Sequence, residues 1–175
     1  MTSAELLIDA FGRIRPVVHD VVDGLTAEQL SSRIDDDANS IAWLVWHLSR
    51  IQDDHIADAA ETAPVWTAAG WAERFGFPFD VRATGFGQSS DEVAAVRVDD
   101  GALLVGYFDA VHDHTTGYLA DITDADLDRI VDDAWDPPVS LGVRLVSVVE
   151  DDLQHAGQAA YVRGIVERAA EPGSS

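Results

Sequence analysis

Residues 145–164 read LVSVVEDDLQHAGQAAYVRG and belong to a longer segment with apolar residues at helical spacing. Apolar positions recur every three or four residues, which predicts one helix from about residue 140 to residue 168. Its inner face comprises Leu141, Leu145, Val148, Ala159, Val162 and Val166. His155 falls at the same angle around the helix, and Asp151 lies one turn earlier on the same side. The segment therefore directs an imidazole and a carboxylate toward the protein interior.

Three further segments show the same periodicity, so the chain is predicted to be all-α. They cover residues 4–22, 39–60 and 99–121. Between the first two, residues 26–29 read TAEQ, a capping box that predicts a short helical turn. Four such helices in one chain of this size favour a four-helix bundle, and we expect all four helices to be antiparallel.

The segment 61–98 differs from the rest of the chain because it is rich in aromatic residues and glycine. Such a composition does not fit a disordered linker. A long loop in a compact domain is usually functional, so we expect a long crossover loop between helices two and three that covers one end of the bundle. The whole of residues 1–170 is predicted to form one domain, and residues 171–175 a flexible tail.

The charge of the chain excludes several classes of partner. The formal net charge is −21, from 32 acidic residues against 11 arginines, and there is no lysine. Binding to nucleic acid or to an anionic membrane requires a basic face, so neither is expected. The absence of cysteine excludes a disulfide, a thiolate metal site and a cysteine nucleophile. With no leader sequence and no long apolar run, we expect a cytoplasmic protein.

Three side chains are candidate metal ligands. His155 and Asp151 stand at i and i−4, a spacing that lets both reach one ion, although it also suits a plain hydrogen bond. His47 lies on the inner stripe of the second helix. Unpaired acids in a bundle core cost several kcal/mol, and a divalent cation would offset that cost. Asp152 and Asp54 are alternative candidates for the third ligand.

Three further histidines and two arginines are assigned other roles. His55 is about 12 Å from His47 along the helix axis, too far to bind the same ion. His112 and His114 flank the stripe of the third helix and are expected to be exposed. Arg50 and Arg163 are expected to form surface ion pairs.

The stretches IAWLVWHLSRIQDDH and LVSVVEDDLQHAGQAAYVRG, with the turn DGLTAEQL, resemble the signature helices of the DinB-like superfamily. Within it, the chain is most similar to the actinobacterial mycothiol S-transferases. The resemblance implies a four-helix bundle, commonly dimeric, that binds zinc or nickel through three histidines. Carried over, His47 matches the first ligand and His155 the last, whereas Asp151 replaces the middle histidine. A carboxylate can ligate zinc, so the site can survive this change.

These expectations define the predicted function. Three protein ligands leave an open coordination position, which is typical of a catalytic metal. The resemblance implies a metal-dependent thiol S-transferase that conjugates mycothiol to a small electrophile, with Zn²⁺ or Ni²⁺ as cofactor and a homodimer as the assembly. Two alternatives remain: a mycothiol-dependent isomerase of the maleylpyruvate type, and a metal-binding stress protein without enzymatic activity.

Overall fold

The computed structural model describes residues 1–170 as a bundle of four long helices with short elements between them. The long helices are α1 (Ser3–Val22), α3 (Ile41–Ala60), α7 (Gly101–Asp121) and α8 (Leu141–Ala170). The short elements are α2 (Ala27–Ser31), α4 (Val65–Ala68), α5 (Trp71–Phe75), α6 (Ser90–Ala95), η1 (Asp126–Asp128), β1 (Ile130–Asp132) and β2 (Val139–Ser140). The predicted tail lies outside the described residues. Within residues 1–170, no helix combines the length and hydropathy needed to cross a membrane.

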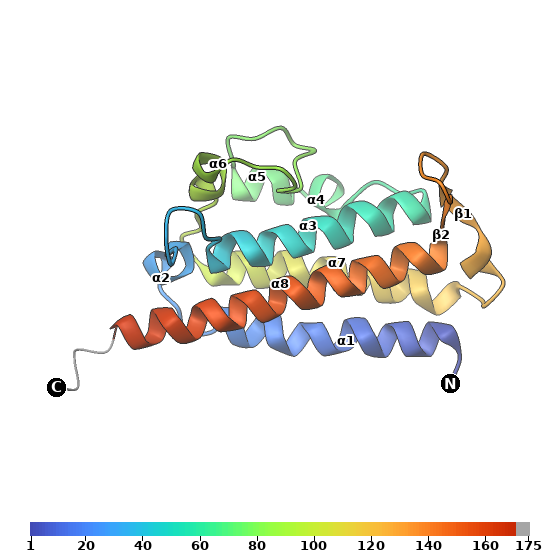
Figure 1. Ribbon diagram of the computed structural model, residues 1–175, viewed down its shortest axis with the longest axis horizontal. Coiled ribbons are helices and arrows are strands. Elements are labelled where there is room, and N and C mark those ends of the chain that lie inside the picture. The colour runs from blue at the N-terminus through green and yellow to red at the C-terminus, as the bar shows by residue number, and fades with distance from the viewer. Residues whose placement is uncertain (171–175) are drawn as a thin grey trace.

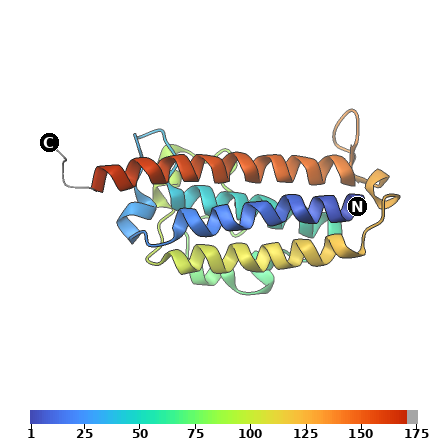
Figure 2. The same cartoon turned by 90° about the horizontal axis from the view of Figure 1, so that it is seen from below.

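The four long helices occupy the corners of the bundle (Figures 1 and 2). Helices α1 and α3 lie at opposite corners, and each packs against both α7 and α8. The course of the chain in Figure 1 shows that α3 runs parallel to α7 and antiparallel to α8. The expectation of four antiparallel helices is therefore wrong. The long crossover returns the chain to the starting end of α3 before α7 begins, so these two neighbours point the same way.

Local hydrogen bonds fix where the helices begin. Thr2, Thr26 and Ser89 each form a capping box at the start of α1, α2 and α6, which confirms the turn predicted from TAEQ. Ser40 caps α3, since its hydroxyl oxygen accepts a hydrogen bond from Trp43 N at 3.1 Å. These caps satisfy backbone N–H groups that have no partner within the helix. The predicted starts of the long helices thus agree with the structure to within two residues.

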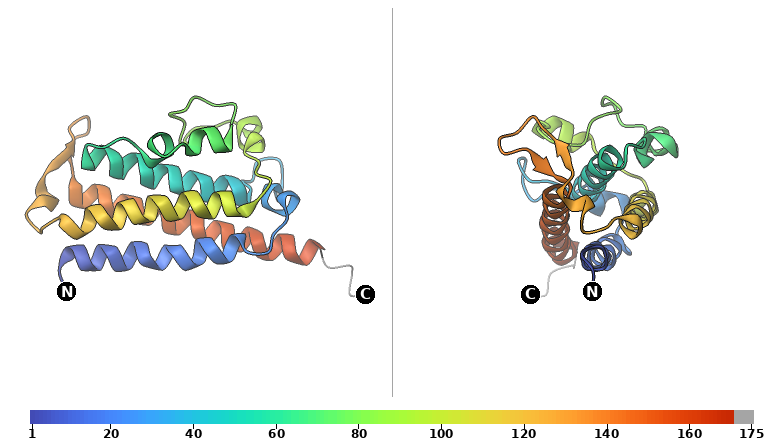
Figure 3. Two further views of the ribbon diagram at one scale, coloured as in Figure 1. Left: turned by 180° about the vertical axis from the view of Figure 1, so that it is seen from behind. Right: turned by 90° about the vertical axis from the view of Figure 1, so that its right-hand side faces the viewer.

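We expected the crossover to cover one end of the bundle. Instead, it lies along the side of the bundle. Its short helix α4 contacts both α3 and α7 (Figure 3). The anchor is Asp53 on α3, whose carboxylate accepts hydrogen bonds from Val65 N at 2.8 Å and Trp66 N at 2.7 Å. Because a carboxylate at the start of a helix binds its free N–H groups, Asp53 holds the beginning of α4 against the bundle.

The hairpin of β1 and β2 was not predicted from the sequence. The two strands pair antiparallel between η1 and α8, with Ile130 opposite Ser140. Arg144 on α8 holds this hairpin, because its Nη2 donates to Asp132 Oδ2 at 2.9 Å. With three and two residues, the strands are too short to show the alternation of apolar and polar residues that predicts a sheet.

Asp152 occupies a core position of α8 that an apolar residue would be expected to fill. Its side chain is fully buried, and neither carboxyl oxygen has a hydrogen-bond partner among the described residues. Burial, reinforced by the nearby charge of Asp151, holds the pKa of Asp152 well above its usual value. An unpartnered polar group in a core is a cost to the folded state.

Replacing Asp152 with leucine is therefore expected to raise the free energy of unfolding by about 1–3 kcal/mol. The raised pKa also sets the pH dependence. The unfolded carboxyl ionises near pH 4 while the folded one stays protonated, so wild-type stability falls as the pH rises from about 4. Urea unfolding at several pH values measures both effects, with leucine at the exposed Asp113 as the control. A less stable Asp152→Leu variant would contradict the prediction.

Candidate metal centre

His47 lies on the inner side of α3, with 4% of its surface exposed. Its Nδ1 is 2.6 Å from the carbonyl oxygen of Thr84. A carbonyl only accepts hydrogen bonds, so Nδ1 carries the proton and Nε2 keeps a free lone pair. The ring of Trp43 stacks on the imidazole, with centroids 4.4 Å apart and planes inclined by 14°. His47 is thus held in the orientation and tautomer of a metal ligand that binds through Nε2.

The contact with Thr84 requires glycine at position 85. The backbone of Gly85 has φ +96°, in the region that side chains rarely adopt. A Cβ atom at this position would lie 2.7 Å from His47 Nδ1 and 3.1 Å from atoms of both Trp43 and Trp46. Only a residue without a side chain lets the crossover approach His47 closely enough to orient its ring.

Gly85→Ala is expected to weaken metal binding by at least about tenfold, as loss of support for a ligand typically does. Gly87→Ala is the matched control, because Gly87 also has positive φ (+73°) but a Cβ there meets no atom within 4 Å. Both variants should lose about 1 kcal/mol from backbone strain. Zinc titration and urea unfolding separate the two effects. Equal zinc affinities in the two variants would show that Gly85 does not position His47.

His155 and Asp151 face His47 from one turn of α8. His155 Nδ1 is 2.8 Å from the backbone carbonyl oxygen of Asp151, so this ring also donates through Nδ1 and leaves Nε2 free. The carboxylate oxygen Asp151 Oδ2 lies 3.3 Å from the same Nδ1. This oxygen is buried and forms no further ion pair with any described residue. A buried carboxylate oxygen beside two imidazoles is an arrangement that suits a bound cation.

The antiparallel packing of α3 and α8 brings the three side chains into one group. One ligand atom from each of His47, Asp151 and His155 lies within 4.8 Å of the other two. The imidazole centroids are 4.6 Å apart, with planes at 69°. Ligand atoms bound to one tetrahedral zinc ion at 2.0–2.1 Å are roughly 3.3 Å apart, so small side-chain rotations suffice to close the site.

The pKa shifts of His47 and Asp151 favour their metal-binding forms, whereas that of His155 favours the protonated ring, from which a metal would displace the proton. Burial lowers the pKa of His47, opposed by its hydrogen bond to Thr84. Burial also acts to lower the pKa of His155, but hydrogen bonds and charge from Asp151 outweigh it and raise that pKa. For Asp151, burial acts to raise the pKa, whereas the hydrogen bond and charge of His155 lower it overall. An ionised carboxylate and a neutral His47 are the forms that bind a metal.

The two alternative carboxylates point elsewhere. Asp152 is fully buried in the bundle core, one residue further around α8. The Asp54 side chain is 47% exposed and lies 4.0 Å from Arg50 Nη2. His55 Nδ1 accepts a hydrogen bond from Arg144 Nη1 at 2.7 Å, at the rim of the α3–α8 groove. Among the described residues, the group of three potential ligands contains neither alternative.

Two predictions about burial are wrong. His112 is buried on α7, with 7% of its surface exposed, because its ring stacks on Phe108 at 6.0 Å. Arg50 is also buried, at 1% exposed, and lies 3.7 Å from Asp53 Oδ2. The roles of Asp53 and Thr84 were not predicted. A charged pair at i and i+3 on a helix could have suggested the first, but nothing local marks a backbone carbonyl as a partner of a distant histidine.

The donor set fits a divalent transition metal. Two imidazole nitrogens and one carboxylate oxygen suit Zn²⁺, Ni²⁺, Fe²⁺ and Mn²⁺. Three protein ligands also leave room for an exogenous ligand, as in catalytic zinc sites. The hydrogen bonds from Nδ1 of both imidazoles to carbonyl oxygens are of the kind that orients histidine ligands in metalloproteins.

Comparisons with known proteins agree with the fold. A family model described as the DinB superfamily matches residues 10–159. The crystal structure of a conserved protein from Enterococcus faecalis superposes with a TM-score of 0.90 at 28% sequence identity, covering 96% of this chain and 99% of that one. No protein of curated function matches the sequence. Because the family model spans most of the chain and accounts for both helices of the candidate metal centre, the chain belongs to the DinB superfamily.

Proposed function

We propose that this protein is a metal-dependent S-transferase that joins a low-molecular-weight thiol to a small electrophile, with mycothiol as the first thiol to test. The observation that carries the proposal is the group of His47, Asp151 and His155, whose ligand atoms lie within 4.8 Å of one another. The chain has no cysteine, so any reacting thiol has to be a substrate.

An ion held by these three side chains would keep an open coordination position for a thiol. A divalent ion with an open position favours the thiolate form of a thiol, and the thiolate is the nucleophile. Asp151 contributes one negative charge to the site, and Nδ1–H of each histidine is held by a carbonyl oxygen. His47 and His155 therefore present Nε2 in a fixed direction.

Two hollows lie along α3 and α8, one toward each end of these helices from the group, and neither is lined by His47, Asp151 or His155. On one side, a hollow of about 370 Å³ is lined by residues that include Leu44, Gly157 and Tyr161. A Cβ atom at Gly157 would meet nothing within 4 Å, so the small residues after His155 leave open space there. On the other side, a hollow of about 360 Å³ is lined by polar residues that include His55 and Arg144. The apolar hollow, which includes Gly157 two residues after His155, suits a small electrophile.

The test is the conjugation of mycothiol to 1-chloro-2,4-dinitrobenzene by zinc-loaded protein, followed by absorbance and by mass spectrometry of the product. The wild type is expected to exceed the uncatalysed rate. His47→Ala and His155→Ala should fall by more than about 100-fold, since even supporting residues of metal sites contribute 10–100-fold. His114→Ala removes a histidine outside the group and should keep the wild-type rate.

Two outcomes would count against the proposal. The first is a rate that does not depend on the thiol. The second is zinc-loaded protein with no rate above background for mycothiol, glutathione or cysteine. An isomerised substrate that leaves with the thiol unconsumed would instead identify a thiol-dependent isomerase, and the mass of the product distinguishes that reaction from conjugation.

A further inference from the structure

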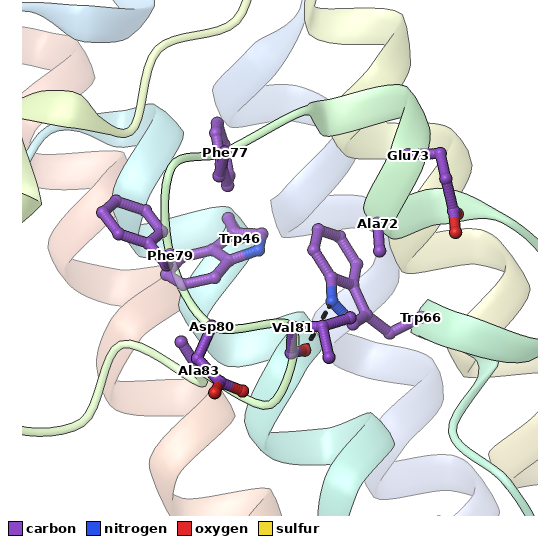
Figure 4. Close-up of a pocket in the computed structure, with 9 residues that line it drawn as sticks. All are labelled: Trp46, Trp66, Ala72, Glu73, Phe77, Phe79, Asp80, Val81 and Ala83. Atoms are coloured by element: carbon purple, nitrogen blue, oxygen red, sulfur yellow. Dashed lines mark hydrogen bonds between the residues drawn. The ribbon is translucent and has the colours of Figure 1, made fainter.

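A further cavity lies between α3 and the crossover and is lined by none of the three candidate ligands (Figure 4). Its volume is about 200 Å³. Four aromatic side chains line it, namely Trp46, Trp66, Phe77 and Phe79. The ring centroid of Trp46 lies 6.3 Å from that of Trp66, 5.4 Å from that of Phe77 and 6.1 Å from that of Phe79. Gly85, which contacts both Trp46 and His47, lies between this aromatic cavity and the metal centre.

The edge of the aromatic cavity is acidic. Glu73 and Asp80 line it, and both are exposed. Asp80 pairs with Arg82 at 3.1 Å, whereas Glu73 forms no ion pair with any described residue. The whole chain carries a net charge of −21, so the surrounding surface also attracts cations. Charge at the cavity therefore favours a positively charged ligand over an anionic one.

Two positive groups near the cavity are paired with carboxylates, Arg82 with Asp80 and Arg50 with Asp53. The guanidinium of Arg50 is 5.4 Å from the ring centroid of Trp66. Asp53 lies 3.7 Å from Arg50 Nη1, and both side chains are buried, so the pair contributes little net charge. The Nε1 of Trp66 donates to the Val81 carbonyl oxygen at 3.0 Å, which fixes this ring as a wall of the cavity.

We propose that the aromatic cavity binds a small organic ammonium ion, of which a trimethylammonium group is the simplest form. Phe77 and Phe79 are partly exposed, whereas Trp46 and Trp66, at 1% and 4% exposed, form the buried walls. Aromatic rings attract a cation through the quadrupole of the π-system, and quaternary ammonium groups are bound in this way by aromatic cages. Methyl groups contact the apolar walls, while the unpaired Glu73 complements the positive charge at the edge. An apolar cavity of about 150 Å³ accommodates benzene, so this one has room for a trimethylammonium head.

The experiment compares two probes of the same shape, choline and its uncharged analogue 3,3-dimethylbutan-1-ol, by calorimetric titration at constant ionic strength. Choline is expected to bind about tenfold more tightly, because the cation–π attraction is absent from the uncharged probe. The same result is expected with and without zinc, since neither probe needs the metal centre. The result of this titration therefore does not depend on the result of the transferase assay.

Variants identify the site that the probe occupies. Phe79→Leu removes one ring of a half-buried residue and should weaken choline binding about threefold to tenfold. Glu73→Gln should weaken it about twofold to fivefold, as expected for an exposed charge. Glu28→Gln makes the same charge change on α2 and should leave the affinity unchanged. Circular dichroism confirms that each variant folds.

Equal affinities for the two probes would overturn the proposal, because the cavity would then be an apolar site without preference for a cation. No heat of binding with choline at concentrations up to the millimolar range would overturn it as well. Choline binding that is insensitive to both Phe79→Leu and Glu73→Gln would place the ligand elsewhere and would equally contradict the assignment.

Discussion

Wild-type protein reconstituted with zinc is expected to retain about one ion per chain through gel filtration, and the His155→Ala variant to retain almost none. His47, Asp151 and His155 are the three protein ligands of the proposed site. The His155→Ala variant keeps two of these ligands, whereas catalytic zinc sites use three protein ligands. The affinity should therefore fall by more than the 10–100-fold typical of supporting residues.

The measurement is elemental mass spectrometry on protein purified without a metal-affinity column. His114→Ala serves as the control, because it removes an imidazole from α7 and leaves the three ligands intact. Asp151→His restores the three-histidine set implied by the family resemblance and should bind zinc at least as tightly as the wild type. Stoichiometric zinc in the His155→Ala variant would show that His155 is a core residue and not a ligand.

The second large effect is expected at Asp53, where alanine should lower the free energy of unfolding by about 3–5 kcal/mol. Asp53 is fully buried and accepts hydrogen bonds from two backbone N–H groups at the start of α4 and from Tyr107 Oη at 2.8 Å. Its removal also leaves the buried charge of Arg50 without its partner 3.7 Å away. An unpaired charge in a protein interior is far more costly than the loss of an exposed ion pair.

Asp54→Ala provides the matched control on the same helix. Asp54 also lies near Arg50, but its side chain is 47% exposed, so its loss should cost no more than about 1 kcal/mol. Tyr107→Phe removes one hydrogen bond of Asp53 and should cost about 1–3 kcal/mol. Urea unfolding followed by circular dichroism gives all three values. Equal stabilities of the Asp53→Ala and Asp54→Ala variants would show that the buried pair does not anchor the crossover.

A double variant at this site separates the effect of the unpaired buried charge from the effect of lost packing. In the double variant with Arg50→Met and Asp53→Leu, both charges are absent, so no buried charge lacks a partner. This variant should recover part of the stability lost in Asp53→Ala, because apolar residues of similar volume often replace buried ion pairs without loss. The hydrogen bonds to α4 stay broken, so the crossover should remain less stable than in the wild type.

Much of the helical structure could be predicted because its causes are local. The spacing of Leu141, Leu145 and Val148 on one face is decided within two turns, and so is the cap that Thr26 provides to α2. The hairpin of β1 and β2 was missed because its strands are too short for any periodicity. Residue type was also a poor guide to burial. Arg50 lies in the core because Asp53 is beside it, and His112 because Phe108 stacks on its ring.

The sequence by itself determined the all-α class, the limits of the long helices and the three candidate ligands, since helix periodicity and capping act between residues that are at most four positions apart. Only the tertiary structure decided that α3 packs antiparallel to α8 and parallel to α7, which brings His47 to Asp151 and His155 across about a hundred residues. The tertiary structure also decided that Asp151, and not Asp152, belongs to the group of potential metal ligands. Successive residues on a helix differ by about 100° in direction, so the packing of α8 turns one carboxylate toward the histidines and the other into the core.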